Sequence, residues 1–251
     1  MASDEAQADW LGGAHAEEAV TGFDATGWEA STWIAHAIYE LPGVSLEYTH
    51  DDAHRAALAS GSVEPLIIGD VDLNEVGVVT GAGLGFAKRP PLDWQRLRWS
   101  ELTRRLDVGT QDHEYPPCHR WFPYSSWPAS IEPPTEGSLD EVSLQVLCRH
   151  LRVATVADDC VAFYGLLGRG MRGDAPALFR GPISGVRDLI DDSAGRIGSP
   201  SNMWPIDRSW FVWTDWDLWA TKVSGSQDLI EAIRSEPELE TIEWSGPARI
   251  D

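Results

Sequence analysis

Two histidines spaced four residues apart are the first candidates for chemistry in this chain. His50 and His54 flank Asp51 and Asp52 in a stretch predicted to be helical. On a helix, side chains at that spacing share one face, as pairs of metal ligands do. The glutamate of an HExxH zinc motif is missing and no third ligand is obvious. A solvated helix face is therefore favoured over a metal site.

A second group of metal-binding residue types lies in the sequence DHEYPPCH, at 112–119. Zinc would use Cys118 and His119 together with His113. Because two prolines separate these residues and two of the ligands are adjacent, they would make an awkward tetrahedron. No metal ion is predicted here.

The cysteines Cys118, Cys148 and Cys160 are candidate nucleophiles, since a thiol beside a histidine can be activated. Cys148 falls on the apolar stripe of a predicted helix, where a thiol behaves as a small hydrophobic side chain. No sequence context activates the other two. The sequence therefore predicts no catalytic residue.

A glycine-rich run, GAGLG at 81–85, follows an apolar stretch that resembles a strand. A dinucleotide loop needs GxGxxG at the start of a helix, so that backbone amides hold the pyrophosphate. Here the spacing is GxGxG, and Pro90 and Pro91 follow closely and disfavour a helix. A turn or bulge is favoured, and no cofactor is predicted.

The densest aromatic segment runs from Trp204 to Trp219 and contains five of the 13 tryptophans. If it forms one strand, alternate residues face opposite sides of a sheet. One side would carry Trp210, Val212, Thr214, Trp216 and Leu218, and the other Phe211, Trp213, Asp215, Asp217 and Trp219. The first set is typical of a core and the second of a polar interface or ligand groove. A sheet packed on both faces is the favoured structural alternative.

The charge of the chain indicates which partners such a face would attract. Forty acidic residues outnumber nineteen basic ones, giving a formal net charge of −21. That field repels nucleic acid and anionic membranes and attracts basic proteins, although it also serves solubility alone. On a partner-binding face, Asp207, Asp215 and Asp217 would supply charge, and Trp213 and Trp219 would be the anchors.

The same composition suggests a cytoplasmic setting. The first residues have neither the basic nor the apolar region of a secretory signal. No apolar run approaches the roughly eighteen residues of a membrane span. Three cysteines without CxxC spacing fit reduced thiols.

The elements that would position these residues indicate a mixed α+β fold, with sheets flanked by short helices. Apolar spacing and capping residues predict helices over 27–41, 49–61, 92–108, 138–151, 185–193 and 226–240. Strands are predicted over 64–88, 160–168, 176–181 and 240–244, and 209–223 is predicted to form one long strand or a hairpin. The C-terminal part is thus a β-(β)-α-β unit.

The domain organisation expected from these elements has three parts. Residues 1–22 form a flexible acidic arm, 23–110 an N-terminal α+β region, and 111–251 a C-terminal α+β domain. The boundary falls in the proline-rich stretch 107–137, which cannot be one regular element. One continuous domain over 23–251 is the alternative.

Four sequence motifs together resemble a family of actinobacterial proteins. They are RWFPYSSWP at 120–128, PPTEGSL at 133–139, LFRGPI at 178–183, and WPIDRSW continuing into TDWDLWAT over 204–221. The resemblance covers about 115–245 and implies a bacterial, cytoplasmic protein in which 120–240 is one folded unit. The family brings no established activity, so the resemblance implies no catalytic residue.

These observations lead to one expected function and two alternatives. The leading hypothesis is a non-enzymatic acidic protein of the immunity or antitoxin type, which binds a basic protein partner. One alternative is a small-ligand binder or hydrolase-type enzyme, with a pocket lined by the aromatic residues of 120–127 and 204–219. The other is a structural housekeeping domain whose tryptophans all belong to the core.

Overall fold

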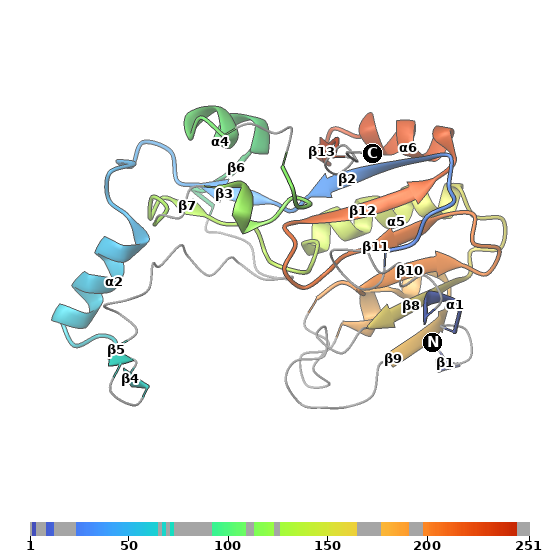
Figure 1. Cartoon of the computed structure of the whole chain (residues 1–251), viewed down its shortest axis with the longest axis horizontal. Coiled ribbons are helices and arrows are strands. Elements are labelled where there is room, and N and C mark those ends of the chain that lie inside the picture. Colours follow the sequence, from blue (N-terminus) through green and yellow to red (C-terminus); the bar gives the residue numbers. More distant parts are fainter. Residues whose placement is uncertain are drawn as a thin grey trace.

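The fold is an α+β arrangement dominated by one large antiparallel sheet (Figure 1). The structure is a computed structural model, and it describes residues 2–3, 9–12, 24–64, 67–68, 71–72, 92–108, 113–122, 126–164, 177–190 and 198–244. The strands of the large sheet are, in spatial order, β1 (Ala2–Ser3), β9 (Ala177–Gly181), β8 (Cys160–Tyr164), β10 (Asn202–Pro205), β11 (Phe211–Trp213), β12 (Ala220–Gly225), β2 (Ala30–Ala35) and β13 (Thr241–Ile242). The predicted mixed α+β class is confirmed, with a larger share of strand than expected.

Two amphipathic helices cover one face of this sheet. They are α5 (Glu141–Val153) and α6 (Gln227–Arg234), which bury an aliphatic stripe against β8, β10, β11, β12 and β2. Asp140 caps α5 by accepting from the backbone of Val142 and Ser143, and Ser226 caps α6 at Leu229. The helices predicted over 138–151 and 226–240 are therefore confirmed, and the first begins after its cap Asp140. With β13 after α6, the predicted β-(β)-α-β unit is also present.

The opposite face of the sheet is covered by aromatic side chains. Trp10, on the short helix α1 (Asp9–Gly12), meets Trp204 and Phe211 edge-on, with ring centroids 5.4 and 5.6 Å apart. Trp33 meets Trp213 at 5.5 Å. The sheet is thus packed on both faces, which was the structural alternative to an exposed aromatic face.

A strand replaces the helix expected over 27–41. β2 is followed by β3 (Ile38–Glu40), and the backbone is extended through most of the segment. Every residue of 32–38 is buried, because β2 lies between β12 and β13 and has covering layers on both faces. A doubly buried strand is apolar at nearly every position, so its residues also fill the i, i+3, i+4 pattern of a helix.

A smaller sheet continues from this strand. β3 lies between β6 (Gln95–Leu97) and β7 (Ile131–Glu132). β6 leads into α4 (Trp99–Arg105), so the helix predicted over 92–108 is confirmed only in its second half. The side chain of Glu240 accepts from the backbone amides of Trp99 and Ser100 and so caps α4 from a distant part of the chain.

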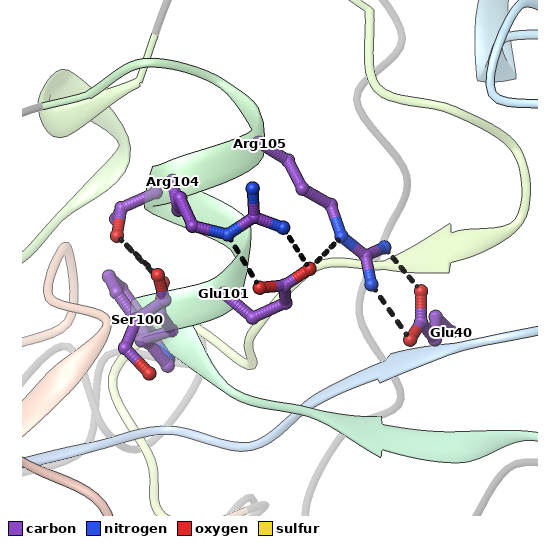
Figure 2. A network of polar contacts seen from close by, with 7 residues as sticks. Glu40, Ser100, Glu101, Arg104 and Arg105 are labelled. Carbon is purple, nitrogen blue, oxygen red and sulfur yellow. Dashed lines mark hydrogen bonds and ion pairs between the residues drawn. The ribbon is translucent and has the colours of Figure 1, made fainter.

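An ion-pair network fastens α4 to β3 (Figure 2). Glu101 accepts from Arg104 at 2.8 Å and from Arg105 at 2.7 Å, and Arg105 also reaches Glu40 at 2.6 Å. These hydrogen bonds from the two guanidinium groups lower the pKa of Glu101 to about 2. The network is structural, since every charge in it has a partner.

The helix α2 (His50–Ala59) projects from the body of the protein together with the short strands β4 (Ile67–Ile68) and β5 (Val71–Asp72) (Figure 1). It confirms the helix predicted over 49–61. Thr49 and Asp52 form a capping box: the Thr49 hydroxyl accepts from the amide of Asp52, and the Asp52 carboxylate accepts from the amide of Thr49.

The remaining connections are irregular, as the prolines of 107–139 indicate. Within that stretch only the 3₁₀ turn η2 (His119–Trp121) and β7 are regular among the described residues. In the described part of the helix expected over 185–193, which ends at Ile190, the structure has 3₁₀ turns, η4 (Ile183–Gly185) and η5 (Arg187–Leu189).

The regions expected as separate units share the large sheet. β2, from 23–110, pairs with β12 and β13, from 111–251. Within 1–22, β1 pairs with β9, and Leu11 of α1 is buried; these parts are packed and do not form a free arm. The rest of 1–22 lies outside the described residues. In the part of the chain that the structure describes, no helix has the length and apolar character needed to cross a bilayer.

Candidate partner-binding surface

The three acidic residues predicted to contact a partner lie in two turns at opposite ends of β11, and Trp213 lies in β11 itself. Residues 206–210 join β10 to β11, and 214–219 join β11 to β12. Asp207 belongs to the first turn, whereas Asp215 and Asp217 belong to the second. The structure therefore brings Asp215 and Asp217 together and places Asp207 apart from them. Of the two forms predicted for 209–223, the hairpin is present, as β11 and β12, and the single long strand is not.

The two tryptophans predicted as surface anchors are buried. Trp213 is 3 % exposed and Trp219 is 5 % exposed. Trp213 packs against Trp33 on the aromatic face of the sheet. Neither ring can reach a partner in this fold, which corrects the prediction for Trp213 and Trp219. The physical reason is that distant segments supply a second layer over the sheet.

Trp219 belongs to a cluster of four rings that we call the aromatic cluster: Trp99, Phe122, Trp127 and Trp219. Phe122 lies 5.1 Å from Trp127 and 5.5 Å from Trp219, measured between ring centroids. Trp127 and Trp219 meet edge-on at 5.5 Å, and Trp99 lies 6.3 Å from Trp219. Such edge-on and tilted pairs are favourable geometries for buried aromatic rings.

The turn at 214–219 presents one tryptophan that the sequence assigned to the core. Trp216 is 39 % exposed and lies between Asp215 and Asp217. Asp217 is exposed, and its carboxylate has no hydrogen bond or ion pair within the described ranges. Asp215 is half-buried, and its carboxylate accepts from the amide of Asp217 at 3.3 Å. Burial raises the pKa of Asp215, and the neighbouring charge of Asp217 acts in the same direction.

Two distant segments clamp this turn. Its Trp219 amide donates to the Pro117 carbonyl at 2.9 Å, and the Gly137 amide donates to the Leu218 carbonyl at 2.9 Å. Gly137 has a φ of +66°, and a Cβ there would lie 2.8 Å from the Cα of Trp216. Only glycine fits this approach, so the glycine of PPTEGSL has a structural reason.

Glu136 is a member of this surface that sequence reasoning missed. It is exposed, and its carboxylate accepts from the indole Nε1 of Trp219 at 3.1 Å. The signal that could have found it is the motif PPTEGSL itself, whose glycine must pack on the turn. Glu136, Trp216 and Asp217 together define what we call the turn surface.

The thiol next to the turn is not an activated nucleophile. Cys118 is buried and bridges to Leu218 as an isolated antiparallel pair. Burial raises its pKa, and the nearby Arg120 opposes this only in part. Burial also raises the pKa of Cys148 and of Cys160 to about 12. The prediction that Cys148 acts as a small hydrophobic side chain agrees with its place beside the aliphatic core.

Beneath the turn, a buried histidine orders a chain of hydroxyl groups. His36 is fully buried, with Nδ1 2.6 Å from the Thr135 carbonyl and Nε2 3.0 Å from the Thr221 hydroxyl. The carbonyl only accepts, so Nδ1 carries the proton and Nε2 accepts from Thr221. Thr221 in turn lies 2.6 Å from the Thr214 hydroxyl, at the start of the turn. Burial lowers the pKa of His36 to about 4, against the Thr135 hydrogen bond and the charge of Asp140.

The candidate metal ligands do not come together. Nε2 of His50 is engaged with the Ile131 carbonyl at 2.9 Å, and the ring of His113 stacks on Trp121. Among the described residues, no cluster of three or more histidine, cysteine or acidic side chains could hold a metal ion. The glycine-rich run at 81–85 and Asp112 lie outside the described residues.

Comparison with protein-family models, with curated proteins and with solved structures found no match to this chain. The resemblance to actinobacterial proteins stays a prediction.

Proposed function

We propose that the protein is a non-enzymatic binding module of the immunity or antitoxin type, which holds a basic protein partner through the turn surface. The observation that carries this proposal is Trp216, an exposed indole ring beside Asp217, whose carboxylate has no partner among the described residues. An aromatic ring beside an acid suits a lysine or arginine side chain, which can stack on the ring and pair with the carboxylate.

The charge inventory of the described residues supports a cationic partner. Nine lysine and arginine side chains already pair with carboxylates of the same chain: Arg55, Arg104, Arg105, Arg149, Arg152, Arg180, Arg187, Lys222 and Arg234. Arg96 and Arg98 donate to backbone carbonyls. Most of the lysine and arginine side chains that the structure describes thus already have a partner within the chain. The net charge of −21 comes from the acidic residues, which outnumber the basic ones. Such a field accelerates encounter with basic proteins and is weakened by salt.

The buried rings favour a structural housekeeping domain over a small-ligand binder as the competing function. Trp121, Phe122, Trp127 and Trp219 pack on one another or on neighbouring residues, so they offer no stacking platform for a small ligand. The same burial favours a structural housekeeping domain as the second candidate. The two remaining candidates differ in whether the turn surface has a partner.

A paired pull-down from a lysate of the native host tests the proposal. The baits are the wild-type protein, the double variant Trp216→Ala/Asp217→Asn, and the matched control Asp207→Asn. All three substituted side chains are exposed, and Asp207 lies at the other end of β11. We expect the wild type and the control to retain the same basic protein at low salt. The double variant should retain at most about one tenth of that amount.

Salt and folding controls decide between the candidates. Recovery should fall at about 1 M salt, where the screening length is about 3 Å. Equal thermal unfolding midpoints for the three baits would show that the turn substitutions leave the fold intact. If no basic protein is recovered at either salt, or the double variant recovers as much as the wild type, the structural candidate is preferred.

A further inference from the structure

Residues 42–64, which we call the α2 extension, expose apolar side chains that the fold leaves uncovered. Val44, Leu46, Tyr48 and Val63 are each between 42 and 49 % exposed. Ile67, just beyond, is 60 % exposed. These five make up half of the large apolar side chains that are exposed among the described residues. The helix α2 itself has no buried residue.

The extension is nevertheless held firmly at its base. The amide of His50 donates to the Trp127 carbonyl at 2.9 Å, and the amide of Ala129 donates to the Tyr48 carbonyl at 2.9 Å. The Ser126 hydroxyl accepts from the amide of Asp51 at 2.9 Å. These backbone contacts, together with the capping box, fix the helix without an apolar core. The exposed apolar side chains of the extension are therefore held in a fixed position, although they do not stabilise the fold.

The base of the extension and the turn surface rest on the same aromatic cluster. Trp127 provides the carbonyl that receives His50, and its ring packs on Trp219 at 5.5 Å. Trp219 ends the turn that carries Trp216 and Asp217, and it is fixed there by its amide contact with Pro117. Figure 1 shows α2 projecting at the end of the molecule where β3 and β7 lie. The extension thus continues from the region of the turn surface.

The charges of the extension limit what can cover it. It carries Glu47, Asp51, Asp52 and Glu64 against the single base Arg55, a net charge of −3. Arg55 already pairs with Asp52 at 2.7 Å. A second copy of this chain would bring the same negative charge, and nucleic acid or an anionic membrane would be repelled as well. A basic protein surface with apolar side chains among its lysines and arginines is complementary.

We propose that the α2 extension is a docking surface for an amphipathic basic segment of the protein partner, with Val44, Leu46 and Tyr48 as its apolar contacts. This inference rests on the proposed function, because it assigns a second contact region to the same basic partner. The turn surface supplies contacts that weaken with salt. The extension supplies apolar contacts, which salt does not weaken.

Defined peptide probes test this surface without knowledge of the natural partner. One labelled peptide is an amphipathic helix of leucine and lysine. A second has the same composition in a scrambled order that removes the apolar face, and a third replaces lysine with glutamate. Binding is measured by fluorescence anisotropy at low salt and at about 1 M salt.

Three variants assign the binding to a surface. The extension variant is Val44→Ser/Leu46→Ser/Tyr48→Ser. The matched control, Val153→Ser/Val156→Ser, removes two apolar side chains that are even more exposed but lie at the end of α5. The turn variant is Trp216→Ala/Asp217→Asn. All substituted side chains are exposed, and unchanged unfolding midpoints confirm that each variant is folded.

We expect the amphipathic basic peptide to bind the wild type and the matched control equally, and the extension variant about tenfold more weakly at high salt. The scrambled and acidic peptides should bind at least about tenfold more weakly than the amphipathic basic one. The turn variant should lose affinity mainly at low salt.

Other outcomes separate the two proposals. If only the turn variant loses affinity, the extension surface is overturned and the proposed function stands. If the matched control weakens binding as much as the extension variant, the extension is not a specific surface. If no basic peptide binds the wild type, both proposals fail. If the extension variant abolishes a concentration-dependent self-association of the wild type, the extension is covered by a second copy, which also overturns the inference.

Discussion

The aromatic cluster and the α2 extension lie side by side, yet the cluster buries its apolar side chains and the extension exposes them. The cluster draws Trp99, Phe122, Trp127 and Trp219 from three separate parts of the chain and buries all four rings. The extension keeps Leu46 and Tyr48 at least 47 % exposed within a segment held by backbone hydrogen bonds. A dense run of tryptophan is therefore not enough by itself to indicate an interface in this protein, because four of the five rings in 204–219 are buried. Exposure depends on whether a distant segment closes over the side chain.

The sharpest test of this contrast removes one large aromatic side chain from each region. Trp219→Ala should reduce the free energy of unfolding by about 3–5 kcal/mol, because it deletes a buried ring and leaves a cavity. Tyr48→Ala should change it by only about 0.5 kcal/mol, because nearly half of that side chain is already in water. Chemical denaturation of both variants and the wild type measures the two values.

The comparison fails if the two substitutions cost similar amounts. A large loss for Tyr48→Ala would mean that the extension stabilises the fold and is not available for a partner. A small loss for Trp219→Ala would mean that the cluster rearranges around the missing ring. The indole of Trp219 also donates to Glu136, so Trp219→Phe separates the lost hydrogen bond from the lost volume.

Local signals in the sequence were enough to predict several helices. Thr49 and Asp52 cap α2, Ser226 caps α6, and both helices begin where the sequence predicts. A helix cap depends on residues within one turn of each other, so it can be recognised in the sequence without knowledge of the fold. The α+β class and the final β-α-β order follow from the same signals.

Long-range packing could not be predicted from the sequence in the same way. The residues of β2 match a helical pattern because neighbouring strands and covering layers bury both faces, and that depends on pairing with residues almost 200 positions away. The alternation expected if 210–219 formed one strand does not hold, because β11 ends at Trp213 and a turn leads into β12, which gives the hairpin alternative. Trp213 and Trp219 were therefore assigned to a partner, and Trp216 to the core, in reverse of their exposure.

The buried histidine beneath the turn should make the stability of the protein depend on pH. His36 has a pKa lowered to about 4 in the folded protein, against 6.5 for an unperturbed histidine. Between these values the unfolded chain binds a proton that the folded chain does not. The free energy of unfolding should therefore fall as the pH drops from about 6.5 towards 4, by about 3 kcal/mol in all.

The variant His36→Gln isolates this contribution from the carboxylates that titrate in the same range. Glutamine does not titrate, so the difference between wild type and variant should be largest above pH 6.5 and shrink on acidification. Denaturation curves at several pH values give that difference directly. A difference that is constant over the whole range would mean that His36 is not buried in its neutral form.

The smallest expected contrast concerns two glycines with left-handed backbone angles, Gly137 at the turn and Gly43 in the α2 extension. Gly43 has a φ of +78° and open space around it, so Gly43→Ala should cost only about 1 kcal/mol of backbone strain. Gly137→Ala adds a Cβ 2.8 Å from the Cα of Trp216, and we expect it to cost about 2 kcal/mol or more. It should also shift Trp216, which quenching of tryptophan fluorescence by iodide would detect, while Gly43→Ala leaves the quenching unchanged. Equal costs for the two would mean that the turn yields freely, and a mobile turn would not hold Trp216 and Asp217 in position for a partner.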